Sequence, residues 1–233
     1  MKAVLLVIAL AVIVRPILVE AASTKPMANI PRKDGKGDKP EIRKTMADFS
    51  RCLLDRASRT VPKYFAAFPM SQRASEIAQN LVDNNRCLFE GSMRMQDNIL
   101  RGALYEAAYR RDYANRPLPP IAKSPQIDYV QGAKVDDKTG PQIALRLMAD
   151  CIVRAAPEGS RALILSDLST EKQAFTAVVP HIDACIPQGK TISFSPSILR
   201  GLIAETLYRL SAATVGPLGF MTTTLSTKDR LNA

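Results

Sequence analysis

Residues 99–110 read ILRGALYEAAYR, and residues 198–209 read ILRGLIAETLYR. Seven of the twelve positions are identical, and the two stretches are 99 residues apart. Cys52 and Cys151 are separated by the same distance, whereas Cys87 and Cys185 are one residue closer. We interpret this pattern as a tandem duplication, and we expect the two copies to share one fold.

The first residues have the organisation of an export signal. Lys2 supplies a positive charge, residues 3–14 form an unbroken apolar run, and cleavage is predicted after residue 21 or 22. An apolar run of this length is shorter than the ~20 residues that span a bilayer, and no second long run follows. We therefore expect a mature chain without a transmembrane segment, in the periplasm of a Gram-negative bacterium or secreted from it. An uncleaved interfacial anchor is the alternative.

Export changes the interpretation of the four cysteines. In an oxidising compartment an even number of cysteines indicates disulfides rather than thiol chemistry. Four cysteines allow three connectivities, and the duplication selects the one in which each copy closes its own bridge. We therefore predict the disulfides Cys52–Cys87 and Cys151–Cys185.

The formal net charge of the chain is +10. The excess is concentrated in residues 22–44, which contain seven basic and three acidic residues. Such an arm favours solubility and contact with anionic surfaces. Because no groove-reading motif or stacking aromatic lies near the basic residues, we expect no nucleic-acid partner. The expected partner is an unknown envelope protein or an anionic envelope polymer.

The periodicity of the apolar residues predicts an all-α fold. We expect two tandem homologous helical modules, residues 45–116 and 141–213, of about four helices each with one disulfide apiece. At about 70 residues, each module has a marginal core that a disulfide would support. The remaining segments are predicted to be a signal peptide, a disordered basic arm, a proline-rich linker and a tail: residues 1–21, 22–44, 117–140 and 214–233.

Capping residues mark where several helices begin. Ser71 and Ser169 are predicted to cap the third helix of the first and second module. In the second module we expect this third helix to run on and deliver Cys185. Ser195 and Pro196 are predicted to cap and open the last helix of that module.

The residues kept in both copies are the candidates for function. The favoured interpretation is structural: Glu106–Arg110 and Glu205–Arg209 form i,i+4 ion pairs on one helix, and Arg101 and Arg200 bond a loop carbonyl or the preceding turn. We expect Gly102 and Gly201 to allow close helix packing. The sharper alternative is a groove for an anionic group, lined by the repeated arginines and tyrosines with the glutamates beside them. The candidate binding residues are Arg101, Glu106, Tyr109, Arg200, Glu205 and Tyr208.

The sequence has no recognisable catalytic or cofactor motif. It contains no P-loop, no dinucleotide-binding glycine motif, no H-E-x-x-H and no G-x-S-x-G elbow. His181 is the sole histidine, and the cysteines lack close C-x-x-C pairs, so zinc is not expected. We predict no catalytic residue, no metal and no cofactor.

The spacing of Cys151, Cys185, Gly189 and the 198–209 stretch resembles a group of uncharacterised exported alphaproteobacterial proteins of sphingomonad type. The first copy matches the pattern less well between Ser58 and Met70. The group has no assigned activity, so the resemblance implies a Gram-negative envelope setting and transfers no catalytic residue.

These observations favour a non-enzymatic binding or scaffolding module of the cell envelope, because two linked, similar faces gain avidity. One alternative is a small periplasmic enzyme with its site between the modules, around Glu106, Glu205 and the paired arginines. The other is a periplasmic stress chaperone that exposes apolar helix faces.

Overall fold

The computed structural model describes residues 39–83, 87, 95–131, 133, 139–186 and 194–215. Every regular element in these residues is a helix, which confirms the predicted all-α class. The first half contains α1 (Lys39–Arg56), α2 (Val61–Ala66), α3 (Gln72–Asp83), α4 (Asp97–Tyr113) and the short 3-10 helix η1 (Ile121–Lys123). The second half contains α5 (Thr139–Ala155), α6 (Pro157–Leu165), α7 (Glu171–Thr176), α8 (Val179–Ile182), the 3-10 helix η2 (Asp183–Cys185) and α9 (Pro196–Val215).

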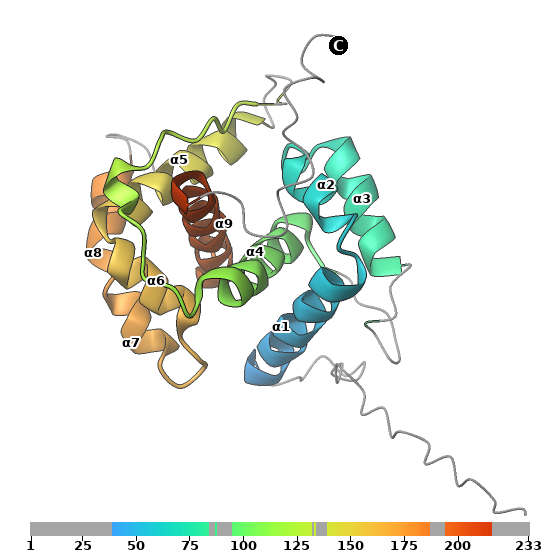
Figure 1. The fold of residues 1–233 in the computed structure, drawn as a ribbon, viewed down its shortest axis with the longest axis horizontal. Helices are drawn as coiled ribbons and strands as arrows, with labels where there is room; N and C mark the ends of the chain where they lie inside the picture. The colour runs from blue at the N-terminus through green and yellow to red at the C-terminus, as the bar shows by residue number, and fades with distance from the viewer. Residues whose placement is uncertain are drawn as a thin grey trace, which may run out of the picture.

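The two helices that carry the repeated stretch, α4 and α9, lie in the middle of the molecule. Figure 1 shows α1–α3 on one side of this pair and α5–α8 on the other. One hydrophobic cluster runs through both halves and includes Leu100 and Leu104 of α4 together with Leu199 and Ile203 of α9. The halves therefore share a core, and their boundary lies inside it.

Two of the three predicted helix starts are confirmed. The backbone N–H of Ala74 donates to Ser71 Oγ at 3.2 Å at the start of α3. The N–H of Ile198 donates to Ser195 Oγ at 3.3 Å, and α9 begins at Pro196. Each serine oxygen satisfies an amide that has no partner within its own helix.

The predicted cap at Ser169 is wrong. The N-cap of α7 is Thr170, and its side chain makes no capping bond. Asp167 Oδ1 instead accepts the backbone N–H groups of Ser169 and Thr170, both at 2.9 Å, as well as their hydroxyl groups. The hydroxyl of Ser169 is thus engaged by Asp167, and α7 begins at Glu171, after Thr170.

The third helix of the second half is broken, contrary to our prediction. It consists of α7, α8 and η2, whereas α3 in the first half is continuous. Pro180 lacks the N–H that would continue α7, and the N–H of His181 bonds the carbonyl of Val178 in a tighter turn at 3.0 Å. Cys185 is therefore reached through a 3-10 turn.

Both predicted disulfides are confirmed. Cys52 bonds to Cys87 and Cys151 bonds to Cys185, each with a Cα–Cα distance of 5.7 Å. The first bridge is buried, whereas Cys151 in the second is exposed.

The predicted segment boundaries are matched only in part by the helices. The predicted export signal, most of the predicted basic arm and residues 216–233 lie outside the described residues. α1 begins at Lys39, inside the predicted arm, and α9 continues two residues into the predicted tail. The linker packs on the second half, because Arg154 donates to the carbonyls of Ser124 and Pro125 at 2.9 Å each.

Candidate functional site

α4 and α9 touch at a pair of glycines. A Cβ atom built on Gly102 would lie 2.5 Å from the Cα of Gly201, and one built on Gly201 would lie 2.8 Å from the Cα of Gly102. Any side chain at either position would collide with the opposite backbone. The predicted close packing at these glycines is confirmed, and it brings the repeated arginines and glutamates of each helix against the other helix.

Arg101 on α4 connects the two halves. Its Nη1 donates to the carbonyl of Tyr64 at 2.9 Å and its Nη2 to that of Phe65 at 2.8 Å, both in α2. Its Nε lies 3.3 Å from both carboxylate oxygens of Glu205 on α9. The guanidinium therefore satisfies carbonyls of its own half and pairs with an acid of the other half.

Arg200 on α9 makes the corresponding contacts. Its Nε and Nη2 each donate to one oxygen of Glu106 on α4, both at 2.8 Å. The same guanidinium donates to the carbonyls of Leu163 and Ile164 in α6 and, at 3.1 Å, to Ser166 Oγ just beyond it.

The contacts of the two arginines follow the offset of the sequence repeat. The carbonyls of Leu163 and Ile164 come 99 residues after those of Tyr64 and Phe65, and each arginine reaches the glutamate of the opposite helix. A pair of duplicated modules related by an approximate two-fold axis would give this reciprocity. The duplication itself remains our interpretation of the sequence.

We call Arg101, Arg146, Glu205 and Arg209 the inner cluster. Arg146 Nη2 lies 3.1 Å from Glu205, and the side chains of Arg101, Arg146 and Glu205 are all at most 3 % exposed. Arg209 is the outermost member, 3.9 Å from Glu205 and 26 % exposed. Arg101, Arg146 and Glu205 are thus sealed from solvent, and Arg209 forms the rim of the inner cluster.

The ionisation of Glu205 is fixed by its neighbours. Burial alone would raise the pKa of Glu205, but the charges of Arg101, Arg146 and Arg209 outweigh burial and hold that pKa well below its usual range. Glu205 therefore stays ionised at neutral pH and cannot supply a proton.

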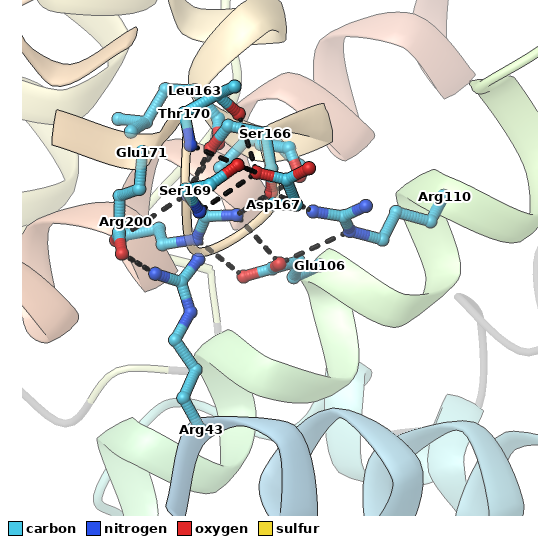
Figure 2. Close-up of polar contacts among 11 residues, drawn as sticks. Arg43, Glu106, Arg110, Leu163, Ser166, Asp167, Ser169, Thr170, Glu171 and Arg200 are labelled. Carbon is cyan, nitrogen blue, oxygen red and sulfur yellow. Dashed lines mark hydrogen bonds and ion pairs between the residues drawn. The ribbon is translucent and has the colours of Figure 1, made fainter. Parts of the chain in front are cut away.

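We call Arg43, Glu106, Arg110, Glu171 and Arg200 the outer cluster (Figure 2). Arg110 Nε donates to Glu106 at 3.2 Å. Arg43, on α1, forms an ion pair with Glu171, and Arg200 Nη1 lies 3.6 Å from the same carboxylate. Arg43, Arg110 and Glu171 are 26 %, 37 % and 30 % exposed, so the outer cluster reaches the surface.

The outer cluster holds three arginines and two glutamates, and the pKa values of Glu106 and Arg43 are both lowered there. Burial would raise the pKa of Glu106, but the hydrogen bond and charge of Arg200 and the charge of Arg110 lower it overall. Burial and the charge of Arg200, with a smaller contribution from Arg110, lower the pKa of Arg43 to about 10, although Glu106 acts in the opposite direction. The arginines of this cluster repel one another, so another anion beside them would be stabilised.

The two repeated tyrosines lie inside the shared core. Tyr109 and Tyr208 are both buried, and Tyr208 Oη donates to Asp112 Oδ2 of the other half at 3.0 Å. The Tyr208 ring also lies 5.7 Å from that of Tyr105 and 5.5 Å from that of Tyr113, measured between centroids. Their rings hold the halves together.

The structure thus places four of the six predicted candidates in the two clusters and the other two, Tyr109 and Tyr208, in the hydrophobic core. Both pairs that we predicted at i,i+4, Glu106–Arg110 and Glu205–Arg209, are present. Three charged residues of the clusters were missed: Arg43, Arg146 and Glu171. The residues 99 positions away from them are Gln142, Ala47 and Gln72, so comparing the two copies gives no signal at these positions.

Other features of the described residues add no competing site. They contain no group of three or more histidine, cysteine, aspartate or glutamate side chains arranged to hold a metal. A cavity of about 330 Å³ lies between α3 and α4, and its lining includes no member of either cluster. No helix in this part of the chain is long and apolar enough to cross a membrane.

Comparisons with known protein families, with curated proteins and with solved structures find no match to this chain.

Proposed function

We propose that this chain is an exported, non-enzymatic binding or scaffolding module of the cell envelope. The observation that carries the proposal is the contrast between the clusters: one seals the joint between the halves, while the other brings surplus positive charge to the surface. A rigid joint fixes the geometry of a surface, and exposed arginines recognise anionic groups.

Export is part of the proposal. It rests on the charged start and apolar run of residues 1–21, and it agrees with the two disulfides, since such bonds persist in oxidising compartments. The predicted setting is the periplasm or the medium around a Gram-negative cell.

The ionisation of the repeated glutamates supports binding over hydrolysis. A general acid needs a pKa near the working pH, whereas the pKa values of Glu106 and Glu205 are both lowered. Glu205 is also sealed from solvent. These properties suit fixed counter-ions of arginines and do not suit proton transfer.

The partner that fits the outer cluster is anionic. Three arginines converge there on two carboxylates, leaving one positive charge in excess. An acidic envelope protein and an anionic envelope polymer both meet this requirement. The basic segment before α1 adds to the attraction at longer range.

In-cell cross-linking of the tagged mature protein in its native envelope, followed by mass spectrometry, tests the proposal. We expect one dominant partner, with capture reduced in the Arg110→Gln variant because that side chain lies at the surface. Arg51→Gln is the matched control. Arg51 is 66 % exposed on α1, and among the described residues its ion pair is with Asp48, three positions earlier on the same helix. Cross-links confined to copies of the chain itself would remove the proposal and direct the work to a substrate screen.

The clusters also determine which variants can map the binding face. Arg101 and Arg200 are almost completely buried and hold the halves together. Their replacement would perturb the fold, so a loss of partner in those variants would not locate a surface. Arg110 is the better probe because more than a third of its side chain is exposed; since its guanidinium also donates to the carbonyls of Leu165 and Ser166, circular dichroism should first show that the variant is folded.

A further inference from the structure

We propose that Glu171 occupies a carboxylate-binding site, and that the ligand of this site is an acidic side chain of a partner peptide bound between Arg43 and Arg200. The inference rests on the proposed binding function and assigns its site and ligand chemistry. Glu171 is in this view an internal competitor that the partner displaces.

The geometry around Glu171 is that of a bound carboxylate. Arg43 Nη1 pairs with its Oε2, and Arg200 Nη1 lies 3.6 Å from its Oε1, so each oxygen faces a different arginine (Figure 2). The same Nη1 already donates to the carbonyl of Leu163 and to Ser166 Oγ, and the other donors of Arg200 bond Glu106 and the end of α6, so Arg200 faces Glu171 as a charge. Arg43 is therefore the hydrogen-bonding partner of this site, and the positive charges of Arg43 and Arg200 flank the carboxylate, one beside each oxygen.

Glu171 can leave this site without unfolding the protein. Its side chain is 30 % exposed, so the carboxylate reaches water by rotation about its own bonds. The backbone before it is fixed independently by Asp167, whose carboxylate holds the turn that leads into α7. Hydrogen bonds from Ser169 and Thr170 keep the pKa of Asp167 at about 2, so this turn stays closed across the physiological range.

A comparison of the two halves indicates that the fold does not require the Arg43–Glu171 ion pair. Gln142 lies 99 residues after Arg43, and Gln72 lies 99 residues before Glu171. The second half thus has glutamine where α1 has Arg43, and the first half has glutamine where α7 has Glu171. The helical fold of each half therefore forms without this charge pair at the other half's equivalent positions, which favours a specific role for the pair in the outer cluster.

Once Glu171 has moved away, Arg43, Arg110 and Arg200 face only Glu106. The positive surplus of the cluster then rises from one charge to two, and an incoming carboxylate restores the original balance. An exposed Leu168, three residues before Glu171, offers an apolar contact for the rest of the peptide. The site therefore favours an acidic peptide with a neighbouring apolar side chain.

The test uses a labelled peptide, SDLSTEKQ, which repeats residues 166–173 of the chain and carries the same carboxylate. Fluorescence anisotropy would measure its binding to the purified mature protein and to the Glu171→Gln variant. Because an internal competitor acts at a high effective concentration, we expect the variant to bind the peptide about tenfold more tightly or better. Glu158→Gln, at an exposed glutamate of α6, is the matched control and should bind as wild type does.

Two further comparisons make the result specific. Adding Arg43→Gln to Glu171→Gln should remove the gain, and the peptide SDLSTQKQ should not bind, although circular dichroism should show both variant proteins folded. Equal affinity of wild type and Glu171→Gln for SDLSTEKQ would overturn the inference. Tighter binding of inorganic phosphate, without tighter binding of the peptide, would overturn the assignment to a carboxylate.

The outcome also separates this inference from the proposed function. If Glu171→Gln gains no affinity for the peptide while cross-linking still captures one dominant partner, the binding module stands and this site is wrong. If cross-linking captures only copies of the chain, the proposed function itself fails.

Discussion

Glu205 and Glu106 occupy equivalent places on α9 and α4, 99 residues apart, yet their surroundings differ. Glu205 is 2 % exposed and is held by the buried Arg101 and Arg146. Glu106 is 19 % exposed and shares Arg200 with a second acid, the partly exposed Glu171. The same repeated residues therefore build a sealed joint on one side and a surface cluster on the other.

The difference lies in the third arginine of each cluster. Arg146 comes from the middle of α5, whereas Arg43 comes from the first turns of α1, near its exposed end. A cation buried beside Glu205 contributes to holding the halves together. A cation near a helix end beside Glu106 remains within reach of solvent and of a partner.

The largest expected effect follows removal of the sealed acid. Glu205→Gln would leave Arg101 and Arg146 buried without their counter-ion, and breaking a buried pair in this way costs about 3–5 kcal/mol. Glu106→Gln should cost less, because Arg200 keeps Glu171 nearby and Arg110 is partly solvated. Urea unfolding of the two variants measures this difference, and equal losses would show that the clusters do not differ as described.

A smaller effect is expected at the helix crossing that both clusters share. Gly102→Ala would force the α4 and α9 backbones apart and weaken both clusters, at a cost of about 1–3 kcal/mol. Gly140→Ala, in α5, is the matched control, because nothing lies within 4 Å of its added Cβ. Thermal unfolding should show a lower midpoint for the first variant only, and an unchanged midpoint would argue against the contact.

Glu205 and Glu106 should also differ in how much stability they contribute as the pH falls. Because the pKa of Glu205 is lower in the folded than in the unfolded state, its contribution is complete above the unfolded value of about 4.5 and is lost as pH falls through the folded value. Wild type should therefore lose stability below about pH 4.5, by at most ~1.4 kcal/mol per pH unit for each such group.

The Glu205→Gln variant should show a flatter acid dependence than Glu106→Gln in the same range. Chemical unfolding at a series of pH values between about 3 and 6 measures both slopes. Parallel curves for the two variants would mean that the two carboxylates are shifted equally, contrary to the burial of Glu205.

The smallest effect is expected at the rim of the inner cluster. Arg209 is 3.9 Å from Glu205 and 26 % exposed, so Arg209→Gln should cost less than about 1 kcal/mol. The difference in the free energy of unfolding between wild type and Arg209→Gln should also shrink as salt is added, since exposed charges are screened. A loss as large as that of Glu205→Gln would place Arg209 among the residues that seal the joint.

Much of this arrangement could be predicted from the sequence. Apolar periodicity gives the helical class, the offset of the cysteines gives both disulfides, and the repeated glycines give the close crossing of α4 and α9. These features leave a signal because each depends on residues that are kept in both copies.

The features that differ between the copies could not be predicted in the same way. Pro180 breaks the third helix of the second half, and Asp167 replaces the expected cap at Ser169. Arg43, Arg146 and Glu171 join the clusters from helices whose counterparts carry other residues at those positions. Which side chains contact a glutamate depends on how α1, α5 and α7 pack. Aligning the two halves of the sequence does not predict that packing.

The most direct test of the division between a structural joint and an exchangeable surface is urea unfolding of the double variant Arg43→Gln with Glu171→Gln, measured beside wild type. It replaces the surface pair with the glutamines found at the positions 99 residues away. We predict a loss of less than about 1 kcal/mol, because an ion pair that is a quarter or more exposed contributes little to folding. A loss of about 3 kcal/mol or more would contradict the account, because it would show that the outer pair is as structural as the sealed one.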